Sequence, residues 1–271
     1  MKPIRLVRAA CAPNLPVGRL GGSLVLATVA LMCAAVLLPT LAPSFPPWPG
    51  AAAAFGLLLV AALVSRRPVV VHLALLACLT AAWRAVWPPF YPLFLLGPLA
   101  VYAILAAALP GLRRTTSWLR RGRFEAGTWM LVALTALASG VALVAWLHYA
   151  RPDLSHWLTF LPPDPLKLAL AGLGFALVNA AVEEAIFRGV LLEALDGVFG
   201  AGHLSVLLQA LPFGLIHLAG VPGGWLGVAL ATSYGWLLGL IRRRSGGLLA
   251  PVLAHVCADA VIFGMLVAWG G

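Results

Sequence analysis

Charged residues are scarce in this sequence of 271 residues: Asp, Glu, Lys and Arg together make up 10% of the chain, whereas hydrophobic residues make up 62%. A soluble globular domain averages about 25% charged residues, so this composition cannot cover a surface that faces water. Acidic residues are especially few, with 8 Asp and Glu against 18 Lys and Arg. The composition excludes a soluble domain and predicts an all-α, polytopic membrane protein that is surrounded by the lipid bilayer.

Cysteine is also sparse, and its spacing does not indicate disulfides or metal binding. The chain contains neither a CxxC pair nor a Cys/His pair at zinc-finger spacing, which argues against a disulfide framework and a structural zinc site. No segment is long and polar enough to form the basic face of a nucleic-acid-binding domain, so we expect no nucleic-acid partner. The four cysteines are Cys11, Cys33, Cys78 and Cys257, and Cys11 follows no apolar run of the kind that precedes a lipidated cysteine.

Long hydrophobic runs fill most of the chain. A helix needs roughly 17–25 apolar residues to cross a bilayer, and the sequence suggests about nine such spans, the first of them an uncleaved anchor. An arrangement with eight spans, in which 50–87 forms a re-entrant hairpin, is the second choice. The nine runs are 20–41, 50–64, 68–87, 90–109, 126–149, 166–192, 203–219, 224–241 and 247–269.

Basic residues cluster in short segments between these runs. With a cytoplasmic N-terminus, the pair Arg66-Arg67, the arginines within 113–123 and the triplet 242–244 all face the cytoplasm, as the positive-inside rule requires. The basic residues Lys2, Arg5 and Arg8 before the first run agree with this orientation. Nine spans then place the C-terminus outside. Because arginine far outnumbers lysine and Gly, Ala and Pro are common, we expect a GC-rich bacterial genome and the bacterial inner membrane.

Six ionisable residues lie well inside the apolar runs of the last 90 residues. An ionisable side chain at the centre of a membrane helix costs about 2.5–3.5 kcal/mol on insertion scales, so such residues usually face a cavity and mark function. We therefore divide the chain into a four-span N-terminal region of unknown role, 1–125, and a five-span catalytic region, 126–271. The six residues are Glu183, Glu184, Arg188, His217, His255 and Asp259.

Helical spacing separates the two adjacent glutamates. Glu184 and Arg188 are four residues apart, about 40° around an α-helix, so we expect them to form an ion pair. Glu183 lies about 140° from Arg188 and can face a cavity, where it would serve as a general base. A purely structural Glu–Arg pair is the alternative interpretation, but it leaves Glu183 unexplained.

The seventh and ninth apolar runs each contain one of the two intramembrane histidines. His217 follows Phe213 by four residues, and His255 precedes Asp259 by four residues, so the members of each pair share a helix face. Each histidine alone is compatible with a core residue that bonds a neighbouring helix, and His255 with Asp259 is compatible with a self-contained pair. Two histidines and a second glutamate that converge in the membrane suit the activation of water, with or without a metal.

Three motifs in this order resemble the CPBP family, which comprises CAAX prenyl proteases of the Rce type and bacteriocin-processing enzymes. The motifs are Glu-Glu-x-x-x-Arg at 183–188, Phe-x-x-x-His at 213–217 and His-x-x-x-Asp at 255–259. The stretch 239–255 also resembles the segment that leads into the last motif of the family. The resemblance covers about 165–269, and many members carry Asn where this chain has Asp259.

The resemblance implies a role for each motif residue. As in intramembrane glutamic proteases, Glu183 and His217 would hold and activate the attacking water. His255 and Asp259 would stabilise the oxyanion of the tetrahedral intermediate; Asp259 would donate only if protonated and would otherwise orient His255. The residues with a supporting role would be Glu184, Arg188 and Phe213.

The resemblance leaves the metal open, because members of the family are often described as metalloproteases. Glu183, His217 and His255 are the ligand types of a catalytic zinc site. They come from three separate runs, however, and lack the His-Glu-x-x-His spacing of a zinc protease helix. The sequence therefore favours catalysis by glutamate without a cofactor, with zinc as the alternative.

These motifs predict an intramembrane endopeptidase that cleaves a membrane-associated protein or peptide. The substrate candidates are a prenylated C-terminal tail, a peptide with a leader, and a C-terminal sorting or anchoring signal, of which the bacterial composition favours the last. A proton- or ion-coupled transporter is an alternative, since such proteins also use intramembrane charges, but no internal repeat is present. A non-catalytic immunity or binding protein on the same scaffold is another. The sequence does not indicate an oligomeric state.

Overall fold

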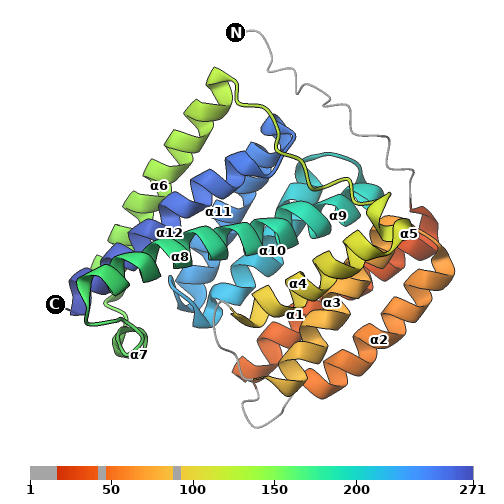
Figure 1. Ribbon diagram of the computed structural model, residues 1–271, viewed down its shortest axis with the longest axis horizontal. Coiled ribbons are helices and arrows are strands. Elements are labelled where there is room, and N and C mark those ends of the chain that lie inside the picture. The colour runs from red at the N-terminus through yellow and green to blue at the C-terminus, as the bar shows by residue number, and fades with distance from the viewer. Residues whose placement is uncertain (1–16, 42–46, 88–92, 271) are drawn as a thin grey trace.

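The computed structural model describes residues 17–41, 47–87 and 93–270, which form a bundle of helices without a strand (Figure 1). The expected all-α class is therefore confirmed. Several residues named above lie outside this described part: Lys2, Arg5, Arg8 and Cys11.

The N-terminal helices pack side by side at one edge of the bundle (Figure 1). Proline occupies the first position of α3 and α5, where its missing N–H costs no helical hydrogen bond. The helices are α1 (Gly18–Leu41), α2 (Pro47–Ser65), α3 (Pro68–Val86), α4 (Leu93–Ala108) and the short α5 (Pro110–Arg113).

The C-terminal helices form the other part of the bundle, in which α12 packs against both α6 and α8, and α10 packs against α11. One helix of 35 residues, Pro165–Phe199, contains a π-helical segment, η1, in its second half. The elements are α6 (Ala126–Ala150), α7 (Ser155–Leu158), α8 (Pro165–Glu184), η1 (Ala185–Leu191), α9 (Leu192–Phe199), α10 (His203–Leu215), η2 (Ile216–Ala219), α11 (Gly224–Ser245) and α12 (Leu249–Gly270).

Each of the nine expected spans corresponds to a helix. Seven described helices are long and apolar enough to cross a membrane, and two apolar helices, Phe94–Ala108 and His203–Ala219, are shorter. The expected end of the sixth span at 192 is wrong, because the helix continues to Phe199. Its last turns carry Glu193, which accepts a hydrogen bond from Ser117, and Asp196, which pairs with Arg243. These partners allow the helix to extend beyond its apolar part.

Two of the basic segments lie beside each other in space. The backbone N–H of Arg123 donates to the Ser245 carbonyl, and the N–H of Leu248 donates to the Arg120 carbonyl, both at 2.8 Å. The connection 114–125 between α5 and α6 therefore runs along the turn between α11 and α12. This contact places the arginines within 113–123 and the arginine triplet at the same end of the bundle.

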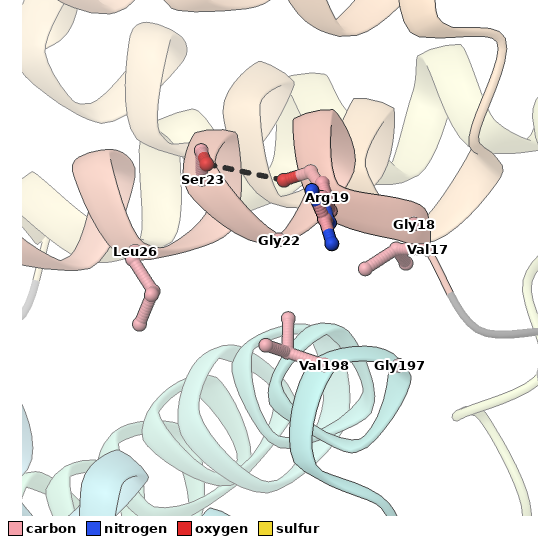
Figure 2. Close-up of a pocket in the computed structure, with 8 residues that line it drawn as sticks. All are labelled: Val17, Gly18, Arg19, Gly22, Ser23, Leu26, Gly197 and Val198. Atoms are coloured by element: carbon pink, nitrogen blue, oxygen red, sulfur yellow. Dashed lines mark hydrogen bonds between the residues drawn. The ribbon is translucent and has the colours of Figure 1, made fainter.

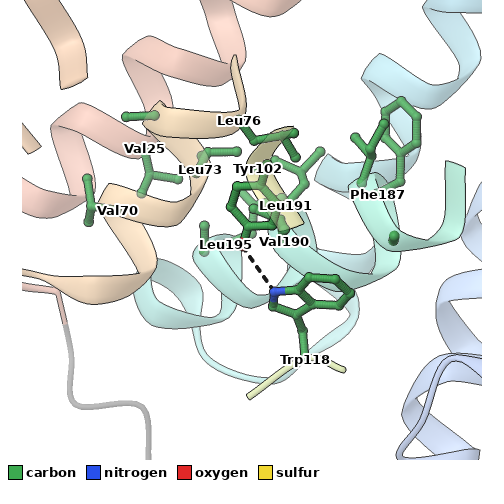
Figure 3. Packing of buried hydrophobic residues seen from close by; sticks show 14 of the residues in the cluster. Val25, Val70, Leu73, Leu76, Tyr102, Trp118, Phe187, Val190, Leu191 and Leu195 are labelled. Atoms are coloured by element: carbon green, nitrogen blue, oxygen red, sulfur yellow. Dashed lines mark hydrogen bonds between the residues drawn. The ribbon is translucent and has the colours of Figure 1, made fainter. Parts of the chain in front are cut away.

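The N-terminal helices and the helix that contains η1 share a hydrophobic core. Figure 3 shows Leu73 of α3 and Tyr102 of α4 close to Leu191 and Leu195, with Trp118 below them. All five side chains are buried, so their removal from water stabilises the contact between the two parts. Residues on both sides of position 125 thus contribute to one core.

Candidate active site

Two packed helices, α8 and α12, supply the centre of the candidate site. Glu183 and Glu184 are the last residues of α8, where the regular α turns give way to the π segment. His255 and Asp259 lie one turn apart on α12. None of the four residues is more than 3% exposed, so the structure brings four of the expected site residues together in the protein interior.

Glu184 contacts a positively charged partner and a histidine through the same oxygen. Arg188 Nη1 donates to Glu184 Oε1 at 2.8 Å, so the expected ion pair is present, and both side chains are fully buried. His255 Nδ1 lies 2.8 Å from that oxygen. An ionised carboxylate can only accept, so Nδ1 carries the proton of this hydrogen bond. Helical spacing paired Glu184 with Arg188 alone, whereas in the structure Glu184 also orients His255.

The other ring nitrogen of His255 faces two carboxylates. Nε2 lies 3.7 Å from Glu183 Oε2 and 3.8 Å from Asp259 Oδ1. Both distances are longer than a direct hydrogen bond, so Nε2 retains its capacity to bond a ligand. Tyr234 of α11 lies edge-on to the imidazole, with ring centroids 5.7 Å apart, and confines it from the side.

Asn179 is a residue of the site that the sequence analysis did not assign. Its amide Nδ2 donates to Asp259 Oδ2 at 3.1 Å, and the side chain is buried. This bond fixes the orientation of the Asp259 carboxylate next to His255. The position of Asn179 one helical turn before Glu183, as a polar residue in an apolar run, was a signal that could have identified it.

Phe213 connects the second histidine to the centre of the site. His217, in η2, is half-buried, and its Nδ1 lies 2.9 Å from the Phe213 carbonyl. Donation to this carbonyl leaves Nε2 of a neutral His217 as an acceptor. The Phe213 ring lies 5.0 Å from the His217 ring and 5.8 Å from the His255 ring, and the Arg188 guanidinium stacks on it at 4.1 Å. Glu183 is close enough to His217 for an electrostatic interaction.

The buried Arg188 is held by the backbone of α11 as well as by Glu184. Its Nη2 donates to the Gly235 carbonyl at 3.1 Å, and Gln209 Nε2 donates to the same carbonyl at 2.9 Å. A Cβ atom at position 235 would lie 2.7 Å from the Phe213 ring and 3.2 Å from Arg188 Nη2. The close approach of α11 therefore requires glycine there, which no pattern in the sequence predicts.

The proposed zinc ligands Glu183, His217 and His255 do not form a metal site in this structure. Within the described ranges, no group of three His, Cys, Asp or Glu side chains is placed to hold a metal ion. Nδ1 of each histidine is already bonded, in one case to Glu184 and in the other to a backbone carbonyl. Zinc would therefore have to bind Nε2 of both histidines, and the described side chains are not grouped around such a position.

A cavity of about 600 Å³ lies apart from these residues, between the start of α1 and the end of α9 (Figure 2). Its lining includes Arg19, Ser23, Leu26 and Val198, and it contains none of the six intramembrane ionisable residues. The candidate active site is thus defined by its polar side chains and not by this cavity.

Comparison with known proteins agrees with the position of the site. The curated proteins and the solved structures gave no match to this chain. A family model described as type II CAAX prenyl endopeptidase, Rce1-like, matches residues 165–261, a segment that begins with α8 and ends within α12. All residues of the three motifs fall inside it. The resemblance drawn from the motifs is confirmed: residues 165–261 match the Rce1-like family of type II CAAX prenyl endopeptidases, which at the level of the family supports a membrane endopeptidase.

Proposed function

We propose that the chain is an intramembrane endopeptidase in which Glu183 activates a water molecule for hydrolysis of a peptide bond. The observation that carries this proposal is the buried cluster in which Glu183 and Asp259 both face His255 Nε2. A purely structural ion pair needs only Glu184 and Arg188. Two further buried carboxylates and a histidine are costly in a membrane protein and are typical of a functional site.

Glu183 and His217 are the groups that hold the attacking water. The Glu183 carboxylate and the free Nε2 of His217 both accept hydrogen bonds, so one water molecule donates to each of them. Glu183 removes a proton as the water oxygen attacks the carbonyl carbon of the peptide bond. It then returns this proton to the amide nitrogen as the C–N bond breaks. The carboxylic acid and the amine are released, and the enzyme is unchanged.

His255 stabilises the negative charge that develops on the carbonyl oxygen. Its Nδ1–H donates to Glu184, and Arg188 holds that carboxylate in place. The carboxylates of Glu183 and Asp259 favour a proton on Nε2, which can then donate to the oxyanion. Asp259 acts through its effect on His255, since its Oδ2 already accepts a bond from Asn179. No step of this mechanism uses a metal.

The substrate class that fits best is a membrane-anchored bacterial protein with a C-terminal sorting or anchoring signal. The polypeptide must reach carboxylates that are at most 3% exposed and belong to helices α8 and α12. A substrate that is itself anchored in the bilayer approaches such a site without leaving the membrane. The Arg-rich, Lys-poor bacterial composition makes a prenylated tail the less suitable candidate.

The test compares cells that express the wild-type chain with cells that express Glu183→Gln. Mass spectrometry of membrane and secreted proteins should reveal one cleavage that is lost in the variant, because glutamine cannot accept the proton of the attacking water. Glu125→Gln is the matched control, since the Glu125 side chain is 67% exposed and remote from the site in the chain. Identical processing in wild-type and Glu183→Gln cells would overturn the proposal, and solute flux that depends on Glu183 would instead indicate the transporter.

We also propose that the N-terminus is cytoplasmic and the C-terminus outside. The adjacency of the segment 114–125 and the α11–α12 turn, each next to an arginine cluster, supports this orientation. In a chain without its native cysteines, single cysteines at Arg114 and after Gly271 should react with impermeant reagents from opposite sides. Arg114 is an exposed position, whereas Trp118 is buried and unsuitable. Labelling from the same side would show that an even number of spans separates the two positions.

Catalysis without zinc makes a further prediction. Active protein washed with a chelator should retain its activity and contain far less than one zinc per chain by elemental analysis. The reason is that the described side chains of Glu183, His217 and His255 are not grouped as the ligands of one metal ion. About one zinc per chain, lost together with activity and restored with it, would disprove the metal-free mechanism.

A further inference from the structure

Trp118 is a buried contact between the N-terminal helices and the π segment. It belongs to the connection 114–125, and its indole Nε1 donates to Tyr102 Oη at 3.3 Å (Figure 3). Tyr102 Oη in turn lies 2.7 Å from His72 Nδ1, and the rings of Tyr102 and Trp118 stack at 6.3 Å. Helices α3 and α4 thus hold the indole in one orientation.

The indole lies directly on the π segment. A Cβ atom at Gly189, the residue after Arg188, would lie 2.7 Å from Trp118 Cε3, so the close approach requires glycine at that position. The backbone of η1 is therefore in van der Waals contact with Trp118. A displacement of the indole would remove this contact from the residues that follow Glu184.

Arg242 joins the same two elements by hydrogen bonds. Its Nη2 donates to the Trp118 carbonyl at 3.1 Å, and its Nε donates to the Arg188 carbonyl at 3.2 Å. A guanidinium can serve both carbonyls because its donors lie in a fixed planar arrangement. Arg242 thus connects the 114–125 segment to the residue whose side chain holds Glu184.

We infer that Trp118 and Arg242 are positioning residues that fix η1, and through it Arg188, Glu184 and His255. The inference rests on the proposed protease function and gives the N-terminal helices a role in it: they orient the indole that supports the π segment. Neither residue touches the reacting atoms. Their effect passes through the Arg188 backbone, the Arg188–Glu184 ion pair and the bond from Glu184 to His255 Nδ1.

The first experiment changes Arg242 and measures both local stability and cleavage. Arg242→Gln and Arg242→Lys should increase hydrogen exchange of the 185–191 amides in the purified full-length protein. Both should also reduce the cleavage identified in the Glu183→Gln comparison by about tenfold or more, since small misplacements of catalytic groups have effects of this size. Arg244→Gln is the matched control, because Arg244 belongs to the same triplet and is exposed.

The Arg242→Lys variant distinguishes the geometry of the guanidinium group from its positive charge. Lysine keeps the positive charge but lacks the planar arrangement that reaches two carbonyls. Wild-type exchange and cleavage in Arg242→Lys would show that charge alone suffices and would overturn the inference. A change in exchange without a change in cleavage, or the reverse, would overturn it as well. The exchange result does not depend on activity, so it tests the contact even if Glu183→Gln leaves processing intact.

A second experiment tests the contact between Trp118 and Gly189 by a double-mutant cycle. Gly189→Ala and Trp118→Ala should each increase exchange in 185–191 and reduce cleavage. In the Trp118→Ala background, Gly189→Ala should have little further effect, because the indole that the added methyl group meets is gone. Additive effects of the two substitutions would show that the two residues act independently, contrary to the inference.

Discussion

Glu184→Gln is expected to be the most destabilising single substitution in the candidate site. The free energy of unfolding should fall by about 3–5 kcal/mol, the usual cost of removing one partner of a buried ion pair. Glu184 Oε1 bonds Arg188 and His255 at 2.8 Å each, so the loss of its charge leaves the fully buried guanidinium without its closest counter-charge. Cleavage should fall with stability, since His255 also loses its orienting carboxylate. Thermal unfolding of the protein in detergent measures the first effect.

Two further variants show whether the ion pair is the cause. Glu125→Gln should unfold like wild type, because the Arg123–Glu125 pair is exposed and its closest distance is 4.0 Å. The double variant Glu184→Gln/Arg188→Gln should be less destabilised than the sum of the single variants, since it leaves no unpaired charge. Wild-type stability of Glu184→Gln would mean that the pair contributes little to the fold.

Glu183→Gln is expected to reduce cleavage by about 10²–10⁴-fold, the usual contribution of a general base. The amide has nearly the shape of the carboxylate but cannot take the proton of the attacking water. Because Arg188 donates its hydrogen bond to Glu184 and keeps it in this variant, the melting temperature should remain close to that of the wild type. Single-turnover cleavage of the substrate found by mass spectrometry, measured beside the melting curve, separates this substitution from Glu184→Gln.

The comparison of the two adjacent glutamates is the strictest test of their assignment. The prediction is loss of cleavage with retained stability at 183, and loss of both at 184. Full activity of Glu183→Gln would remove it from the mechanism. If Glu183→Gln unfolded at the lower temperature and Glu184→Gln did not, the structural and catalytic roles would have to be exchanged.

Helix positions followed from hydropathy, because each span must satisfy its backbone hydrogen bonds within itself. The pair of Glu184 and Arg188 followed from local spacing, because residues four apart lie on the same face of a helix. The boundary at 192 was wrong because the last turns of the helix depend on Ser117 and Arg243, which are distant in the chain. Hydropathy detects the apolar part of a helix but not an end that polar partners stabilise.

The remaining features of the site required the three-dimensional structure. A helical wheel assumes 3.6 residues per turn, so it cannot reveal the wider turns of η1. The bond from Glu184 to His255 joins residues 71 positions apart, and the bond from Asn179 to Asp259 joins residues 80 positions apart. Both depend on the rotation of α8 against α12, which side-chain packing decides and the composition of either helix alone does not.

The helix of 35 residues that contains η1 has a consequence for the surrounding lipid. At 1.5 Å per residue it is about 50 Å long, whereas the hydrocarbon core of a bilayer is about 30 Å thick. A tilt of even 40° leaves it about 38 Å along the membrane normal, so hydrophobic mismatch persists and its C-terminal turns project from the bilayer. The charged residues Glu193 and Asp196 lie in those turns. The depth of Glu183 in the membrane therefore depends on lipid thickness. In the proposed protease, the acyl-chain length of the lipids would then decide which bond of a spanning substrate reaches Glu183.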